Sequence, residues 1–103
     1  MAEAAAPLAA PRALVLDAAD NVAVALRALS AGERLELDGA GAVTLREPIH
    51  FGHKLAIRPI AAGSPVRKYD ETIGVAGVDI PVGAHVHVHN VVSARLPGPQ
   101  DAR

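Results

Sequence analysis

Three histidines that alternate with valines near the end of the chain are the residues best suited to chemistry. They are His85, His87 and His89, three of the five histidines in the sequence. Side chains on a β-strand alternate between its two faces, so these imidazoles should share one face. Imidazole titrates near neutral pH and binds metal ions. The run therefore indicates metal binding or proton transfer, with Val86 and Val88 on the core side.

Strand geometry limits how many of these histidines can bind one ion. Residues two apart on a strand have side chains about 6–7 Å apart, and two imidazoles at that spacing can converge on a metal. The three together span about 13 Å, too far to hold one ion. We therefore expect at most two ligands, His87 and His89 first, with His85 as the remaining candidate ligand, hydrogen-bond donor or proton shuttle. The alternative is a polar strand face against solvent or a partner.

Two short motifs and one amide add further candidate groups. His53-Lys54 combines a titratable ring with a cation that can bind a carboxylate, and the alternative is an ordinary surface loop. In Lys68-Tyr69, the lysine can bind a carboxylate and the tyrosine can donate to a departing hydroxyl; the alternative is a strand end with a half-buried ring. Asn90 is a candidate for substrate contact, for fixing a histidine tautomer, or for holding a turn.

Short strands between glycine- and proline-rich turns are expected to position these groups, after one helix. Asp20 is a suitable helix N-cap, apolar residues then recur at helical spacing, and Gly32 is a suitable stop, so we predict a helix over 21–30. Apolar and polar residues alternate on both sides of Asp38-Gly39, which predicts a hairpin over 33–46.

A seven-residue pattern recurs at 29–35, 60–66 and 80–86. Each copy has an apolar residue, two small or apolar residues, glycine, two variable residues and a final apolar residue. Glycine allows a turn with positive φ, so each copy predicts a turn that leads into a strand. The pattern is typical of a compact, mainly β domain of folded hairpins.

Composition restricts the class of protein. The 103 residues include one Phe, one Tyr, no Trp and no Cys, which predicts one small domain with a modest aliphatic core and no disulfide. The net charge of −1 without a basic patch argues against nucleic acid. The chain lacks the ~20 apolar residues of a membrane span, and we expect a cytoplasmic protein. The domain should occupy 12–93, between a disordered Ala/Pro-rich segment 1–11 and a flexible tail or linker 94–103.

Four short motifs occur in order along residues 20–92. They are Asp20 to Leu26, Gly52-His53-Lys54, Lys68-Tyr69 with Ile73-Gly74, and Gly83 to Asn90. In this order they resemble the N-terminal domain of altronate and galactarate dehydratases. The resemblance implies an SAF-type domain with the β-clip fold, which is shared with the antifreeze-like domain of sialic acid synthases.

The resemblance also implies a chemistry and a partner. The family eliminates water from sugar acids, or sulfite in the similar sulfolactate sulfo-lyase, commonly with a divalent metal, for which we expect iron. The domain is fused to a large catalytic region in some members and is a small subunit in others; a subunit and an excised fragment would look alike. We expect a chain that is inactive alone and lends His53, Lys54, His87 and His89 to catalysis beside a large catalytic subunit.

Other readings of the sequence stay open. The chain can be a non-catalytic SAF binding or assembly module, the small subunit of a sulfo-lyase, or an independent small metalloenzyme. An unpaired β edge would also allow a homo-oligomer.

Overall fold

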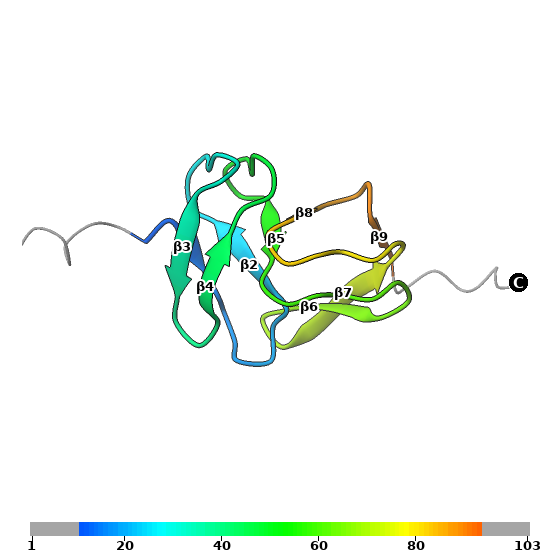
Figure 1. The fold of residues 1–103 in the computed structure, drawn as a ribbon. Helices are drawn as coiled ribbons and strands as arrows, with labels where there is room; N and C mark the ends of the chain where they lie inside the picture. The colour runs from blue at the N-terminus through cyan, green and yellow to red at the C-terminus, as the bar shows by residue number, and fades with distance from the viewer. Residues whose placement is uncertain (1–10, 94–103) are drawn as a thin grey trace, which may run out of the picture.

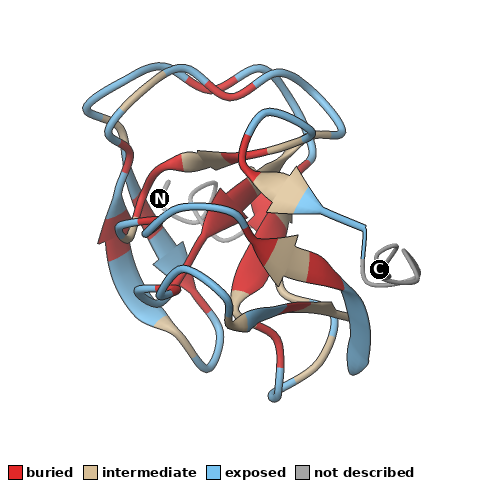
Figure 2. Cartoon of the chain, turned by 90° about the vertical axis from the view of Figure 1, so that its right-hand side faces the viewer, coloured by how far each residue is buried: buried red, intermediate tan, exposed pale blue. Residues whose placement is uncertain are grey.

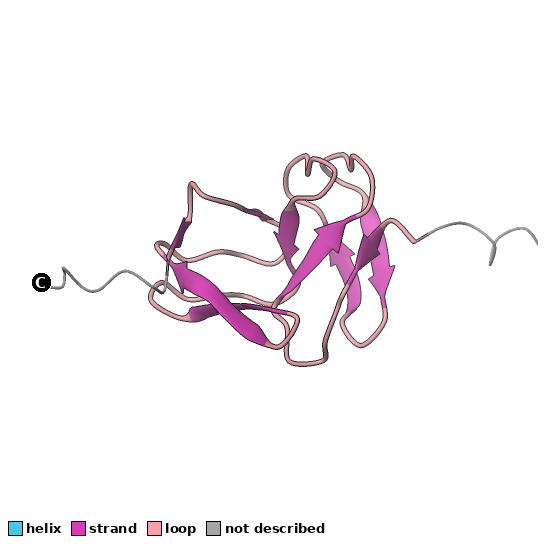
Figure 3. Cartoon of the chain, turned by 180° about the vertical axis from the view of Figure 1, so that it is seen from behind, coloured by secondary structure: helices cyan, strands magenta, loops and turns pink. Residues whose placement is uncertain are grey.

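The computed structural model describes residues 11–93 and shows only short β-strands there, with no helix (Figures 1 and 3). The nine strands are β1 (Ala13–Leu14), β2 (Val22–Ala25), β3 (Arg34–Leu37), β4 (Gly41–Thr44), β5 (Lys54–Ala56), β6 (Pro65–Lys68), β7 (Glu71–Ala76), β8 (His85–Val86) and β9 (Val91–Val92). The mainly β prediction is confirmed. Within this part of the chain no helix could cross a membrane. The predictions for the two terminal segments, before residue 11 and after residue 93, lie outside the described residues.

The strands form three antiparallel groups. The central sheet has the order β1-β2-β5-β8, and it lies between the β3–β4 hairpin and the sheet β6-β7-β9 (Figure 1). The predicted hairpin over 33–46 is confirmed, because β3 pairs with β4 from Arg34↔Thr44 to Leu37↔Gly41. Every strand in this arrangement is short, so the position of each side chain depends on the turns that join the strands.

The predicted helix over 21–30 is wrong. Its first half is strand β2, which lies between β1 and β5 in the central sheet. Val22, Ala23 and Ala25 are all buried, because elements cover both faces of this strand. A strand buried on both faces has a continuous apolar run, which periodicity does not distinguish from a buried helix. Alanine, a strong helix former, adds to the ambiguity.

Asp20, which the sequence suggested as a helix cap, instead holds a distant turn. Its fully buried carboxylate accepts hydrogen bonds from the N–H groups of Tyr69 and Asp70, both at 2.8 Å, and of Asp17 at 3.1 Å. Tyr69 and Asp70 have positive φ, 56° and 61°, in the tight β6–β7 turn. Such a conformation costs an L-residue roughly 1–2 kcal/mol. The charge-assisted hydrogen bonds from Asp20 offset that cost and fix the turn beside Lys68.

The seven-residue pattern occurs four times, and the copy at 49–55 is missing from the sequence prediction. In each copy the glycine turns the chain with a φ near 85°: Gly32 (87°), Gly52 (83°), Gly63 (85°) and Gly83 (87°). The first residues of the copies pair through isolated bridges, Leu29 with Ile49 and Ile60 with Ile80. The four turns therefore form two pairs, and the two members of each pair are joined symmetrically through an antiparallel bridge.

Backbone hydrogen bonds repeat this symmetry. In every copy the glycine N–H donates to the carbonyl four residues before the partner copy: Gly32 to Leu45 (2.8 Å), Gly52 to Ala25 (2.8 Å), Gly63 to Ala76 (2.7 Å) and Gly83 to Ala56 (2.8 Å). The first and last apolar residues of each copy are buried and fall into two core clusters, one per pair. Figure 2 shows buried segments along the central strands and exposed loops around them.

Candidate functional site

His53, His85 and His87 converge from two separate parts of the chain. One possible ligand atom from each ring lies within 4.8 Å of the others. His53 directly precedes β5, His85 opens β8, and His87 directly follows β8. Strands β5 and β8 pair with Leu55 opposite His85, and the same register places His53 opposite His87. The cluster is therefore a product of strand pairing between the second and fourth copies of the repeated turn.

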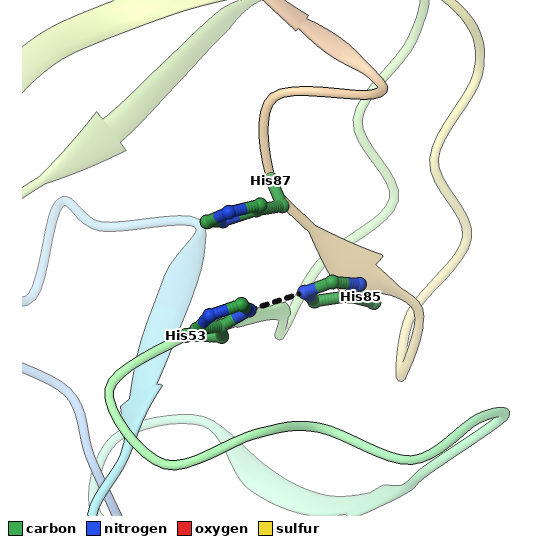
Figure 4. A group of neighbouring side chains, drawn as sticks. All are labelled: His53, His85 and His87. Atoms are coloured by element: carbon green, nitrogen blue, oxygen red, sulfur yellow. Dashed lines mark hydrogen bonds between the residues drawn. The ribbon is translucent and has the colours of Figure 1, made fainter.

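The ring of His87 lies over that of His53, and the ring of His85 lies beside His53 with a nitrogen of each facing the other (Figure 4). The rings of His53 and His87 stack with centroids 4.0 Å apart and an interplanar angle of 10°. His53 Nδ1 lies 2.9 Å from His85 Nε2, so one of these nitrogens donates a hydrogen bond and the other accepts it. All three side chains are half-buried. The arrangement can hold a proton between two rings or present several nitrogens to one cation.

The environment of His53 and His85 favours the neutral form of their imidazole rings. The pKa of His53 is lowered from its usual value by burial first, and then by the charges of neighbouring histidines and Lys54. The pKa of His85 is lowered by burial first and then by His89 and its other histidine neighbours, against an opposing effect of Glu47. Because neutral imidazole is the form that binds a metal, both shifts favour ligation.

The histidine run is not a single strand. Strand β8 ends at Val86, which is fully buried, and the chain turns directly after it, so that Val88 is 82% exposed. The expectation that Val88 faces the core is therefore wrong. His89 is exposed, and its ring centroid lies 5.1 Å from that of His85, tilted by 33°. The structure groups His53, rather than His89, with the other two rings, and the ligand assignment stays a prediction.

Asn90 folds the loop that carries the last two histidines. Its side-chain amide donates to the carbonyl of His85 at 2.8 Å, and its Oδ1 accepts from the N–H of His87 at 2.9 Å. Asn90 is also nearly buried, at 9% exposure. These contacts hold the turn, which was one of the roles considered from the sequence. Substrate contact by Asn90 stays a prediction, and its amide already bonds the backbone on both sides.

A pocket of about 430 Å³ adjoins the cluster and shares His87 with it. The lining residues are Lys54, Lys68, Ile73, His87, Val88, Val91 and Ser93. Burial lowers the pKa of Lys54 first, and the charge of Lys68 lowers it further, so the two ammonium groups are electrostatically coupled. Tyr69 does not line the pocket; it lies in the adjacent turn and is 67% exposed. The structure thus brings together both lysines and one histidine of the predicted site.

Two features of the site were missed from the sequence. Glu47 accepts a hydrogen bond from the backbone N–H of His85 at 2.9 Å and so fixes the start of β8. The grouping of His53 with His85 and His87 was also missed. The copy of the turn pattern at 49–55 could have indicated it, because this copy places His53 directly after the turn glycine.

Over residues 11–94 the chain matches the family described as the altronate/galactarate dehydratase SAF domain. This match covers most of the sequence, including all the strands of the described part. The chain belongs to this SAF family.

The relatives are of two kinds. Altronate dehydratase of Escherichia coli is 48% identical over 75 residues, which are 73% of this chain and 15% of that protein. Altronate dehydratase of Bacillus subtilis is 42% identical over 71 residues, which are 69% of this chain and 14% of that protein. The (2R)-sulfolactate sulfo-lyase subunit alpha of Chromohalobacter salexigens is 39% identical over 88 residues, 80% of this chain and 94% of that subunit. The chain thus spans about 15% of the length of the altronate dehydratases and nearly all of a sulfo-lyase subunit.

Proposed function

We propose that this chain is the SAF part of a lyase that acts on a hydroxy acid, and that it supplies a histidine cluster and two lysines to a site completed by a larger catalytic polypeptide. The observation that carries the proposal is the convergence of His53, His85 and His87, whose possible ligand atoms lie within 4.8 Å of one another. The relatives named above support the reaction class, because both kinds are named as lyases or dehydratases of hydroxy acids.

The cluster fits a divalent metal. Two imidazole nitrogens bound at about 2.0–2.1 Å to a tetrahedral ion lie about 3.3 Å apart. The closest pair here, His53 Nδ1 and His85 Nε2, is 2.9 Å apart, so small side-chain rotations would admit an ion. Three protein ligands leave a position for substrate or water, as in catalytic sites. Imidazole suits iron among other metals, and we propose iron.

The reaction requires positive charge beside the carboxylate of the substrate and groups that take up and release protons. Elimination from a 2,3-dihydroxy acid removes the proton next to the carboxylate and expels the β-substituent. A bound metal would act as a Lewis acid on an oxygen of the substrate. Lys54 and Lys68 would stabilise the negative charge that grows on the carboxylate as the proton leaves. His89 is exposed at the edge of the cluster, outside the group of possible ligands, and we assign it proton transfer.

Exposed apolar side chains near the site support a partner surface. Val88 lines the pocket and is 82% exposed, and Phe51, two residues before His53, is 69% exposed. Large exposed apolar groups around a polar site are typical of a contact surface. A larger catalytic polypeptide or domain that covers these groups would exclude water from the pocket and complete it.

Reconstitution tests this function. The chain is mixed with its large-chain counterpart and ferrous iron, and turnover of altronate, galactarate and sulfolactate is measured for the mixture and each component alone. We expect turnover only in the mixture, lowered at least ~100-fold by His53→Ala or His87→Ala. The matched control is Arg34→Gln, at an exposed ion pair with Glu36 on the distant hairpin, which should leave turnover unchanged. Full turnover by the large chain alone would instead favour an assembly role.

A further inference from the structure

Both lysines of the chain line the same pocket. The sequence contains two lysines, Lys54 and Lys68, and eight arginines. Lys54 lies on β5 and Lys68 ends β6, so two different sheets bring them to the lining of one pocket, which also contains His87. Every other Lys or Arg position in the sequence is an arginine. Lysine is therefore used in this chain only where the two side chains face one cavity.

The pocket lysines have no carboxylate partner within the described part of the chain. The ion pairs recorded for residues 11–93 all use arginine: Arg12–Glu33, Arg34–Glu36 and Arg67–Asp70. The lining of the pocket contains no acidic side chain. Arg67 is next to Lys68 in sequence, but its guanidinium binds Asp70 and Thr72. Two positive charges thus face a cavity to which residues 11–93 contribute no carboxylate.

Rigid elements hold both lysine stems. Lys54 is paired with Val24 on one side and Val86 on the other, within the central sheet. Lys68 is fixed by the β6–β7 turn, whose backbone Asp20 holds through two hydrogen bonds of 2.8 Å. The remaining wall is mostly aliphatic, with Ile73, Val88 and Val91 in the lining. An aliphatic wall excludes water and strengthens the attraction between an anion and the ammonium groups.

We propose that this pocket is an anion subsite that binds the acid group of an organic acid, carboxylate or sulfonate, between Lys54 and Lys68. The inference rests on the proposed function, because the acid group is that of the lyase substrate. An ammonium group is a point charge with freely rotating donors, whereas arginine presents a planar fork that matches one geometry. Lysine therefore accepts planar carboxylate and tetrahedral sulfonate alike. The shared lining residue His87 places the next carbons of the bound acid toward the histidine cluster.

Titration of the 103-residue chain tests the subsite without turnover or metal. Sodium D-glycerate, sodium 3-sulfolactate and neutral glycerol are added to ¹⁵N-labelled, chelator-treated protein at constant ionic strength. Both anions should shift the amides of residues 54, 68, 88 and 91 with millimolar affinity, and glycerol should not. Lys54→Gln and Lys68→Gln should each weaken binding about tenfold, Lys68→Arg should retain carboxylate binding, and Arg34→Gln should bind like the wild type.

The outcomes separate this inference from the proposed function. Unchanged affinity in the Lys54→Gln/Lys68→Gln double variant, equal shifts with glycerol, or no binding of either anion would overturn the subsite. Those results would remove the lysines from the proposed function but leave its histidine part intact if His53→Ala still abolishes turnover of the reconstituted enzyme. Lysine-dependent anion binding together with full turnover by the His53→Ala enzyme would support the subsite and overturn the proposed role of the histidine cluster. Binding of only one of the two anions would overturn the claim that the pocket accepts both acid groups.

Discussion

Replacement of Asp20 by asparagine should destabilise the domain through a turn that lies 49 residues away in sequence. The carboxylate accepts three backbone hydrogen bonds, and the side chain is fully buried. An asparagine amide keeps one acceptor oxygen, but its NH₂ group then faces an N–H donor. One buried donor left unsatisfied costs about 1–3 kcal/mol, and the remaining hydrogen bonds lose their charge assistance. We therefore expect Asp20→Asn to lower the free energy of unfolding by about 3 kcal/mol.

Urea unfolding followed by circular dichroism measures this loss, and the turn itself offers a control. Tyr69 and Asp70 both have positive φ, which is the backbone of a tight hairpin turn that favours Asn-Gly. The double change Tyr69→Asn/Asp70→Gly should stabilise the domain by about 1 kcal/mol and recover part of the loss in the Asp20→Asn protein. This background also keeps the weakened variant folded enough to measure. A loss below about 1 kcal/mol, or no recovery by the Asn-Gly turn, would refute the argument that Asp20 holds the turn.

Three further perturbations test the fold around the site. Gly83→Ala should destabilise the domain by several kcal/mol, because a Cβ there would lie 2.1 Å from the carbonyl oxygen of Thr44 and φ is 87°. Thermal unfolding measures this loss, and a variant of near-native stability would contradict the geometry. Asn90→Ala should lower the free energy of unfolding by about 1–3 kcal/mol and weaken metal binding, because backbone groups of the histidine loop lose their partner. The pKa values of His53 and His85 are lowered from 6.5 in the folded state, so the metal-free unfolded chain binds more protons below that pH. The contribution of these two histidines to the free energy of unfolding should therefore be complete above pH 6.5 and fall as the pH drops below it. A rise in the free energy of unfolding on acidification to pH 5 would be inconsistent with these shifts.

The sequence predicted those elements whose signals are local. The 33–46 hairpin was predicted correctly because period-two alternation and an Asp-Gly turn both lie within one segment. The 21–30 helix was wrong because β2 is covered on both faces, so its apolar run carries no strand period. Asp20 favours a helix start by residue type, but its partners are backbone groups of a distant turn, which no local pattern reveals.

The site was predicted in part for the same reason. Three histidines in alternation suggested one strand, whereas Asn90 ends the strand early by bonding the loop backbone. His53 joins the cluster only through the pairing of β5 with β8, which is a long-range contact. The repeated turn motif could have predicted this pairing. In the copy at 49–55, His50 and Phe51 stand where the other copies have mostly small residues, so this copy does not fit the pattern that the other three share.

Cobalt(II) binding to the 103-residue chain, followed by its visible absorption, tests the central claim most directly. Wild-type protein should bind one equivalent, and His53→Ala should lower the affinity more than about 100-fold, beyond the 10–100-fold typical of outer-shell changes. His89→Ala is the matched control, because its ring lies outside the group of possible ligands, and its affinity should stay within about threefold of the wild type. Tight binding that survives His53→Ala but is lost in His89→Ala would contradict the three-histidine site described by the fold.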